Sequence, residues 1–215
     1  MNKLLTILIT TLTITVFGQV EQNKNPSDFL PKGYVVFEKI NGDLNKDSFE
    51  DCVLIIKGTD KQKIVTGESS GQLDRNRRGI IVLFKKKDHY ELALKNYDCF
   101  SSENEDGGNY YAPELSVEIR DGNLYVHYLY GRYGFWKYTF RFQNSDFELI
   151  GYDKSSNREP LIQSETSINL LSKKKQRKVN TNENAEGGDE VFKETWTNIT
   201  VDRLIKLSEI KDFDE

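Results

Sequence analysis

The chain has 215 residues, of which 34 are Asp or Glu and 30 are Lys or Arg, so its formal net charge is −4. This mildly acidic balance argues against nucleic acid as a partner, because binding to phosphates needs clustered cations. Aromatic residues, chiefly 11 Tyr and 12 Phe, make up 12% of the chain and favour β structure.

The first 18 residues have the character of a secretory signal peptide. A single Lys3 precedes an apolar run over residues 4–17, and Val16 and Gly18 are small residues at positions −3 and −1 of a cleavage site. This run is too short for a membrane anchor, and no later stretch is long enough to span a bilayer. We therefore expect a periplasmic or secreted protein without a membrane span.

From residue 34 onward, short runs of alternating apolar and polar residues are separated by turn residues, a pattern that predicts β-strands. We expect strands at residues 34–39, 52–56, 80–85, 90–97, 115–119, 124–130, 135–142, 147–152, 167–171 and 191–200. Their close spacing leaves little room for helices. The sequence therefore predicts an all-β fold, a single antiparallel meander domain built as a sandwich or as partial propeller-like sheets.

This β domain should span residues 34–210, with a flexible arm at 19–33 and a short tail at 211–215. Residues 57–78 are polar and contain several glycines, which favours a solvated connection. The basic run SKKKQRK at 172–178 could meet a polyanion, but a solvated hairpin tip is the preferred interpretation.

The most specific chemical pattern lies in NGDLNKDSFEDCVLII, residues 41–56. Asp43, Asn45, Asp47 and Asp51 stand at positions 1, 3, 5 and 9 of a loop that runs into a strand, with the Phe49 carbonyl at position 7. Oxygen ligands at this spacing can surround one hard cation, and their mixture of Asp and Asn suits calcium.

This pattern, D-x-N-x-D-x-x-x-D before a strand, resembles the calcium loops of integrin-α-type FG-GAP repeats, in a single copy. Ser48 departs from that pattern, because glycine is usual where the backbone turns sharply, and Leu54 at position 12 excludes an EF-hand. The resemblance implies a bound Ca²⁺. The alternative is an Asx-rich turn that hydrogen-bonds its own backbone without an ion.

Both cysteines, Cys52 and Cys99, lie in the part of the chain that would be exported. Paired cysteines in an oxidising compartment more often form a disulfide than stay free, so we expect a Cys52–Cys99 bridge. Such a bridge would stabilise the fold by about 3–4 kcal/mol.

The segment 130–136 is the best candidate for ligand binding. Tyr130, Arg132, Tyr133, Phe135 and Trp136 are grouped around a glycine-hinged turn, and these residue types anchor partners or stack on sugars and peptides. Aromatic residues at strand ends can equally pack into the core, so both interpretations stay open.

No complete catalytic motif is present. The chain resembles uncharacterised exported β proteins of gram-negative bacteria with one calcium-type loop. This resemblance implies a periplasmic or secreted location but no reaction. We expect a monomeric, non-catalytic binding module, ordered by calcium, whose partner is a protein, peptide or glycan of the cell envelope. The alternative is a hydrolase of envelope or environmental polymers, using paired carboxylates from the acidic loops at 103–108 and 183–188.

Overall fold

The computed structural model describes residues 20–67, 71–104, 112–158 and 160–213. Their strands form two large sheets and one small hairpin, and every strand pair among them is antiparallel. The expected all-β fold is thus confirmed. The signal peptide predicted at 1–18 lies outside the described residues.

The first sheet has five strands in the order β1-β7-β6-β3-β2. Its members are β1 (Gln22–Asn23), β2 (Tyr34–Gly42), β3 (Asp51–Gly58), β6 (Arg78–Lys85) and β7 (Tyr90–Phe100). Between β3 and β6 the chain forms a short 3-10 turn and a separate hairpin, where we expected only a connection. These are η2 (Lys61–Lys63), β4 (Ile64–Gly67) and β5 (Gly71–Asp74).

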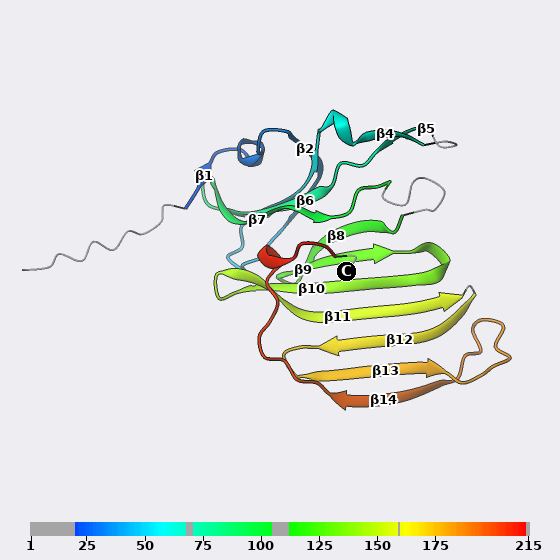
Figure 1. Ribbon diagram of the computed structural model, residues 1–215. Helices are drawn as coiled ribbons and strands as arrows, with labels where there is room; N and C mark the ends of the chain where they lie inside the picture. The colour runs from blue at the N-terminus through cyan, green and yellow to red at the C-terminus, as the bar shows by residue number, and fades with distance from the viewer. Residues whose placement is uncertain (1–19, 68–70, 105–111, 159, 214–215) are drawn as a thin grey trace, which may run out of the picture.

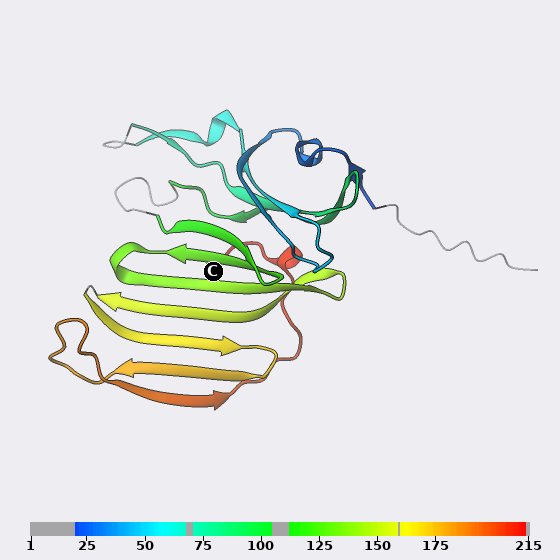
Figure 2. The same cartoon turned by 180° about the vertical axis from the view of Figure 1, so that it is seen from behind.

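The second sheet is a meander of seven strands in which sequence neighbours are also spatial neighbours, from β8 to β14. Its members are β8 (Glu114–Arg120), β9 (Asn123–Leu129), β10 (Gly134–Gln143), β11 (Asp146–Arg158), β12 (Leu161–Asn169), β13 (Lys174–Asn180) and β14 (Phe192–Asn198). Figure 1 shows β8 next to the five-stranded sheet and β14 farthest from it, and Figure 2 shows the same arrangement from behind.

The central strands of the five-stranded sheet, β3 and β6, are buried on both faces. One face of β3 carries Val53 and Ile55 into a core shared with the seven-stranded sheet. The other face carries Leu54 and Ile56 into a smaller cluster closed by Phe29, which belongs to the short 3-10 turn η1 (Pro26–Phe29). Burial on both faces explains why β3 and β6 read as continuous apolar runs rather than as alternating ones.

The seven-stranded sheet is buried over only half of its width. Its inner face, which meets the five-stranded sheet, carries Val126, Tyr128, Phe140 and Phe147 into the shared core. No residue of β12, β13 or β14 within the described chain is buried, and all of β14 is exposed. Strands β12–β14 therefore extend as a solvated wing, the name used below for this part of the sheet.

The expected disulfide is wrong. Cys52 and Cys99 are free thiols, both fully buried. Cys52 on β3 belongs to the cluster with Phe29, whereas Cys99 on β7 belongs to the core between the two sheets. Because the two side chains point to opposite faces of one sheet, no bridge can join them without a rearrangement of the backbone.

The C-terminal segment closes the space between the two sheets. Leu207, in the 3-10 turn η4 (Leu207–Glu209), and Phe213 are buried in the shared core. The Asn96 side chain donates hydrogen bonds to the Leu207 and Ile210 carbonyls at 2.8 and 2.7 Å. These contacts connect the end of the chain to β7.

Candidate functional site

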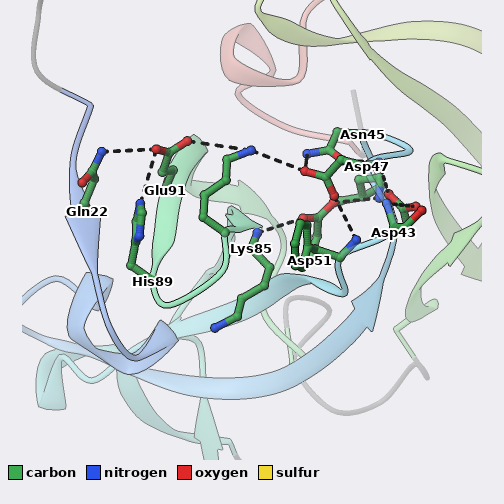
Figure 3. Close-up of polar contacts among 12 residues, drawn as sticks. Gln22, Asp43, Asn45, Asp47, Asp51, Lys85, His89 and Glu91 are labelled. Carbon is green, nitrogen blue, oxygen red and sulfur yellow. Dashed lines mark hydrogen bonds and ion pairs between the residues drawn. The ribbon is translucent and has the colours of Figure 1, made fainter.

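The Asp-rich loop connects β2 to β3 and folds around its own side chains (Figure 3). The Asp43 carboxylate accepts hydrogen bonds from the backbone N–H groups of Asp47 and Ser48, at 3.2 and 3.0 Å. Asn45 Oδ1 also accepts from the Asp47 N–H, at 2.9 Å, and Asp47 Oδ1 accepts from the Phe49 N–H, at 3.0 Å. This is the bonding of an Asx-rich turn.

Two residues of this loop that are not glycine adopt left-handed backbone angles. Lys46 has φ 62° and Ser48 has φ 71°. Ser48 thus takes the conformation for which glycine is usual, at a cost of about 1–2 kcal/mol. The hydrogen bonds from the loop backbone to Asp43 and Asp47 offset part of this cost.

Asp51 lies at the base of the loop and is fully buried. Its two carboxylate oxygens accept from the Leu44 N–H at 2.8 Å and from the Lys85 N–H at 2.9 Å, so it joins the loop to β6. Burial raises the pKa of this carboxyl, and the charges of Asp47 and Asp43 add to the increase, although both backbone hydrogen bonds oppose it.

The pKa of Asp47, at the surface of the loop, is shifted in the opposite direction. Burial opposes its ionisation, but hydrogen bonds from Phe49 and Asn45 and the nearby Lys86 ammonium lower the pKa overall. Lys86 Nζ lies 3.4 Å from Asp47 Oδ2 and 4.0 Å from Glu91 Oε2. The loop therefore carries its negative charge beside the half-buried Lys86 ammonium.

The donor set fits a hard cation in its chemistry, because three carboxylates and one amide oxygen lie on one short loop. A carboxylate oxygen that accepts one N–H also retains a further lone pair for a metal. The geometry is less convergent: within the described residues, no three His, Cys, Asp or Glu side chains come together as a metal cluster. Asp51 in particular directs both of its oxygens at backbone N–H groups.

The aromatic turn joins β9 to β10 through η3 (Gly131–Tyr133). The rings of Tyr130 and Tyr133 lie 5.1 Å apart, and the Arg132 guanidinium lies 5.3 Å from the centre of the Tyr133 ring. Tyr133 is 43% exposed. The structure therefore brings three of the five predicted binding residues together at the surface.

The other two predicted residues lie on opposite faces of β10. Trp136 stacks on the buried Tyr128 at 5.3 Å and meets the edge of Tyr130 at 6.4 Å, so it anchors the turn to the core. Phe135 points to the outer face, where it packs against His127 at 5.3 Å. Phe135 is thus separated from the surface that Tyr130, Arg132 and Tyr133 form.

The acidic loops show no facing pair of carboxylates among the described residues. Residues 105–111 lie outside them, and Glu103 forms an ion pair with Lys57 at 3.1 Å. In the second loop, Glu190 accepts hydrogen bonds from the Ile162 and Gly188 N–H groups, which help to lower its pKa. Asp51 is the one carboxyl in the described chain with a clearly raised pKa, and it is fully buried.

Sequence reasoning missed an open cavity on the wing. It has a volume of about 530 Å³ and is lined by Ser167, Asn169, Ser172, Lys174 and Trp196. The available signal was Trp196, a large aromatic residue in the middle of the mostly polar strand β14.

No family model matches this chain, and no curated protein or solved structure was found to be similar to it. Within the described residues, no helix is long and apolar enough to cross a membrane.

Proposed function

We propose that this protein is an exported, non-catalytic binding module that contacts a protein, peptide or glycan of the cell envelope through its aromatic turn. The observation that carries this proposal is the surface formed by Tyr130, Arg132 and Tyr133 around a turn that the core holds in place. Tyrosine and arginine combine large contact area with hydrogen-bonding groups, which makes them frequent anchors of interfaces.

The turn is suited to binding because its conformation is largely fixed. The Tyr130 N–H donates to the Gly134 carbonyl and the Tyr133 N–H donates to the Tyr130 carbonyl, both at 2.9 Å. Trp136 holds the turn from below through its stack on Tyr128. A preformed surface loses little conformational entropy when a ligand binds, so more of the contact energy appears as affinity.

A binding test follows directly. Immobilised envelope fractions, separated into peptidoglycan, surface polysaccharide and protein, are incubated with the wild type, Arg132→Ala and Tyr133→Ala. Each substitution should weaken retention on one fraction by at least about tenfold, because hot-spot truncations cost roughly 2 kcal/mol or more.

Arg120→Ala is the matched control, since Arg120 also lies over a tyrosine ring, that of Tyr125, at 4.9 Å. It removes the same type of pair from a different strand. Equal loss in this control, or release of soluble products from any fraction, would contradict a specific non-catalytic module.

We propose further that the Asp-rich loop binds one Ca²⁺ through Asp43, Asn45, Asp47 and Asp51, with the Phe49 carbonyl. The support is the spacing of these oxygens and the conformation of Ser48. A cation would offset the repulsion among three carboxylates and fix the loop that leads into β3. Its binding would then stabilise the module without contacting the aromatic turn.

Calcium binding to the folded state should raise the melting temperature in proportion to ln[Ca²⁺] above the dissociation constant. Thermal melts are compared in EDTA and in millimolar CaCl₂, for the wild type and for Asp47→Ala. The wild type should melt higher with calcium, and the variant should not respond. Identical melts of the wild type in both buffers would leave the loop as a plain Asx-rich turn.

A further inference from the structure

The wing carries a second surface with the features of a binding site, on the outer face of the sheet. Trp136 and Tyr138 of β10 point into the core, so Lys137 between them points outward. Lys137 is opposite Asp153, Asp153 opposite Ser167, Ser167 opposite Gln176, and Gln176 opposite Trp196. Trp196 therefore lies on the outer face, away from the aromatic turn.

Trp196 is unusually exposed for its type, at 60%. Its indole N–H is hydrogen-bonded to Glu194, which fixes the direction of the ring, and the side chain lines the open cavity of about 530 Å³. Leaving a large aromatic ring in water forgoes a considerable burial free energy. A ring held in place beside a cavity is instead available to stack on a ligand.

The other residues that line this cavity carry polar side chains. Asn169 and Ser167 come from β12, Lys174 comes from β13, and Ser172 comes from the turn between them. Asn169 Oδ1 accepts from the Ser172 N–H at 2.9 Å, which holds the turn and leaves the Asn169 amide N–H₂ free to donate. Hydroxyl and amide groups around one aromatic ring suit a ligand with hydroxyls at its rim.

The charges at the cavity favour an anionic ligand. Lys174 has no ion-pair partner among the described residues, and no carboxylate lines the cavity. The carboxylate beside the indole, Glu194, lies outside the cavity lining and accepts hydrogen bonds from the Trp196 and Gln176 side chains. Asp153, along the same row, is held by Lys137 at 3.2 Å and by the Ser167 hydroxyl at 2.7 Å. One free ammonium therefore stands beside the exposed indole.

We propose that this cavity binds an acidic saccharide. A pyranose ring would stack its C–H face on Trp196, its hydroxyls would meet Asn169 and the two serines, and its carboxylate would meet Lys174. This site is independent of the aromatic turn, so it stands even if the proposal for that turn fails.

The two tryptophans of the chain allow each surface to be read separately. In Trp136→Phe, indole fluorescence reports the cavity alone, and in Trp196→Phe it reports the aromatic turn alone. Trigalacturonate is titrated into Trp136→Phe, with galactotriose as the neutral probe and tri-glutamate as the acidic peptide probe. We expect a saturable change with trigalacturonate and a response at least about tenfold weaker with galactotriose.

Lys174→Ala, made in Trp136→Phe, should weaken trigalacturonate binding by about tenfold and bring it close to that of galactotriose. Lys178→Ala is the matched control: it removes the same charge from the same face of β13, but Lys178 is paired with Glu165 at 3.4 Å and lies outside the cavity. Lys178→Ala should bind trigalacturonate as tightly as Trp136→Phe does.

Any of three results in the Trp136→Phe background would overturn the proposal: no saturable response to either sugar at millimolar concentration, an equal response to tri-glutamate, or equal losses in Lys174→Ala and Lys178→Ala. Circular dichroism of each variant establishes that the fold is intact, which the exposed position of Lys174 and the half-buried position of Lys178 favour. A response to trigalacturonate seen only in Trp196→Phe would place the saccharide at the aromatic turn and would also refute this site.

Discussion

At the scale of single residues, Asp51 shows how one buried carboxylate holds a loop. Its oxygens satisfy two backbone N–H groups, from Leu44 and Lys85, that would otherwise be buried without partners. The arrangement also buries a charge, which is why its pKa is raised. The loop is thus held at an electrostatic cost that a bound cation or a proton would reduce.

Asp51→Asn should lower the free energy of unfolding at pH 7 by about 1–3 kcal/mol, because the amide can accept only one of the two hydrogen bonds. Since the folded state holds the proton of Asp51 more tightly than the unfolded state, protonation stabilises the wild type as pH falls through the raised pKa. In urea denaturation at pH 7, 5 and 4, the free energy of unfolding of the wild type should rise relative to that of the variant as the pH falls toward 4. If that of the variant rises relative to the wild type instead, the pKa of Asp51 is lowered in the fold.

The two thiols give a second prediction. Burial raises the pKa of Cys52 to about 11 and raises that of Cys99 further. Thiolates react and thiols do not, so the native protein should not react with a thiol reagent at pH 8. In denaturant without reductant, the same protein should expose two free thiols per chain to the reagent. A result of no free thiols after denaturation would restore the disulfide.

At the scale of elements, the turn between β9 and β10 depends on one glycine. Gly134 has φ 115° and ψ −153°, a region that essentially only glycine adopts, and an added Cβ would lie 2.1 Å from the Ser155 carbonyl oxygen. Gly131 has φ 46°, and its Cβ would meet no atom within 4 Å. The turn therefore has room for a side chain at Gly131 but not at Gly134.

Gly134→Ala should lower the free energy of unfolding by about 3 kcal/mol or more, since both the backbone angle and the contact with β11 must change. Gly131→Ala, the matched control, should cost about 1 kcal/mol. Denaturant midpoints measure both. Similar midpoints for the two variants would mean that β11 moves aside at Ser155.

The elements also show where the sequence could and could not predict the fold. Strands with a buried face, such as β3 and β9, were located because burial imposes an apolar pattern. The sequence predicts a hairpin tip at 172–178, part of which is strand β13, because no residue of β13 is buried and Val179 is its only apolar residue. The disulfide was wrong because sequence separation does not reveal that Cys52 and Cys99 face different cores.

The candidate sites, too, could be predicted only where a local sequence pattern fixes the structure. The Asp-rich loop and the aromatic turn were found because local spacing fixes their geometry. The Trp196 cavity was missed because its residues come from β12, β13 and β14, and only the register of the sheet brings them together. A pairing of three strands with weak patterns cannot be inferred reliably from one sequence.

At the scale of the whole molecule, burial is distributed unevenly. The central strands β3 and β6 lie between two apolar clusters, whereas the wing contributes no buried residue within the described chain. Few buried contacts mean a low free energy of local opening. The half of the seven-stranded sheet that carries the cavity should therefore be its less stable half.

Hydrogen exchange should show this difference. Amides of β13 and β14 should exchange through local opening, well before those of β3 and β6, which should open only with global unfolding. Exchange followed by mass spectrometry of peptides from these strands is the measurement. Uniform protection across all four strands would indicate that the wing is covered in solution, for example by a second copy of the chain.

The order of strands in the second sheet has a consequence for how the chain acquires its structure. Each of its pairings, from β8 to β14, closes a short loop, whereas the five-stranded sheet must bring β1 to β7 across most of its length. Short loops close with less entropy loss, so the C-terminal meander is expected to form early in refolding even though it is synthesised last. Until β3 and β6 dock on it, its inner face with Val126 and Phe140 would remain open to water and to other chains. The protein would then be most prone to aggregation in the interval between formation of the seven-stranded sheet and docking of the five-stranded one.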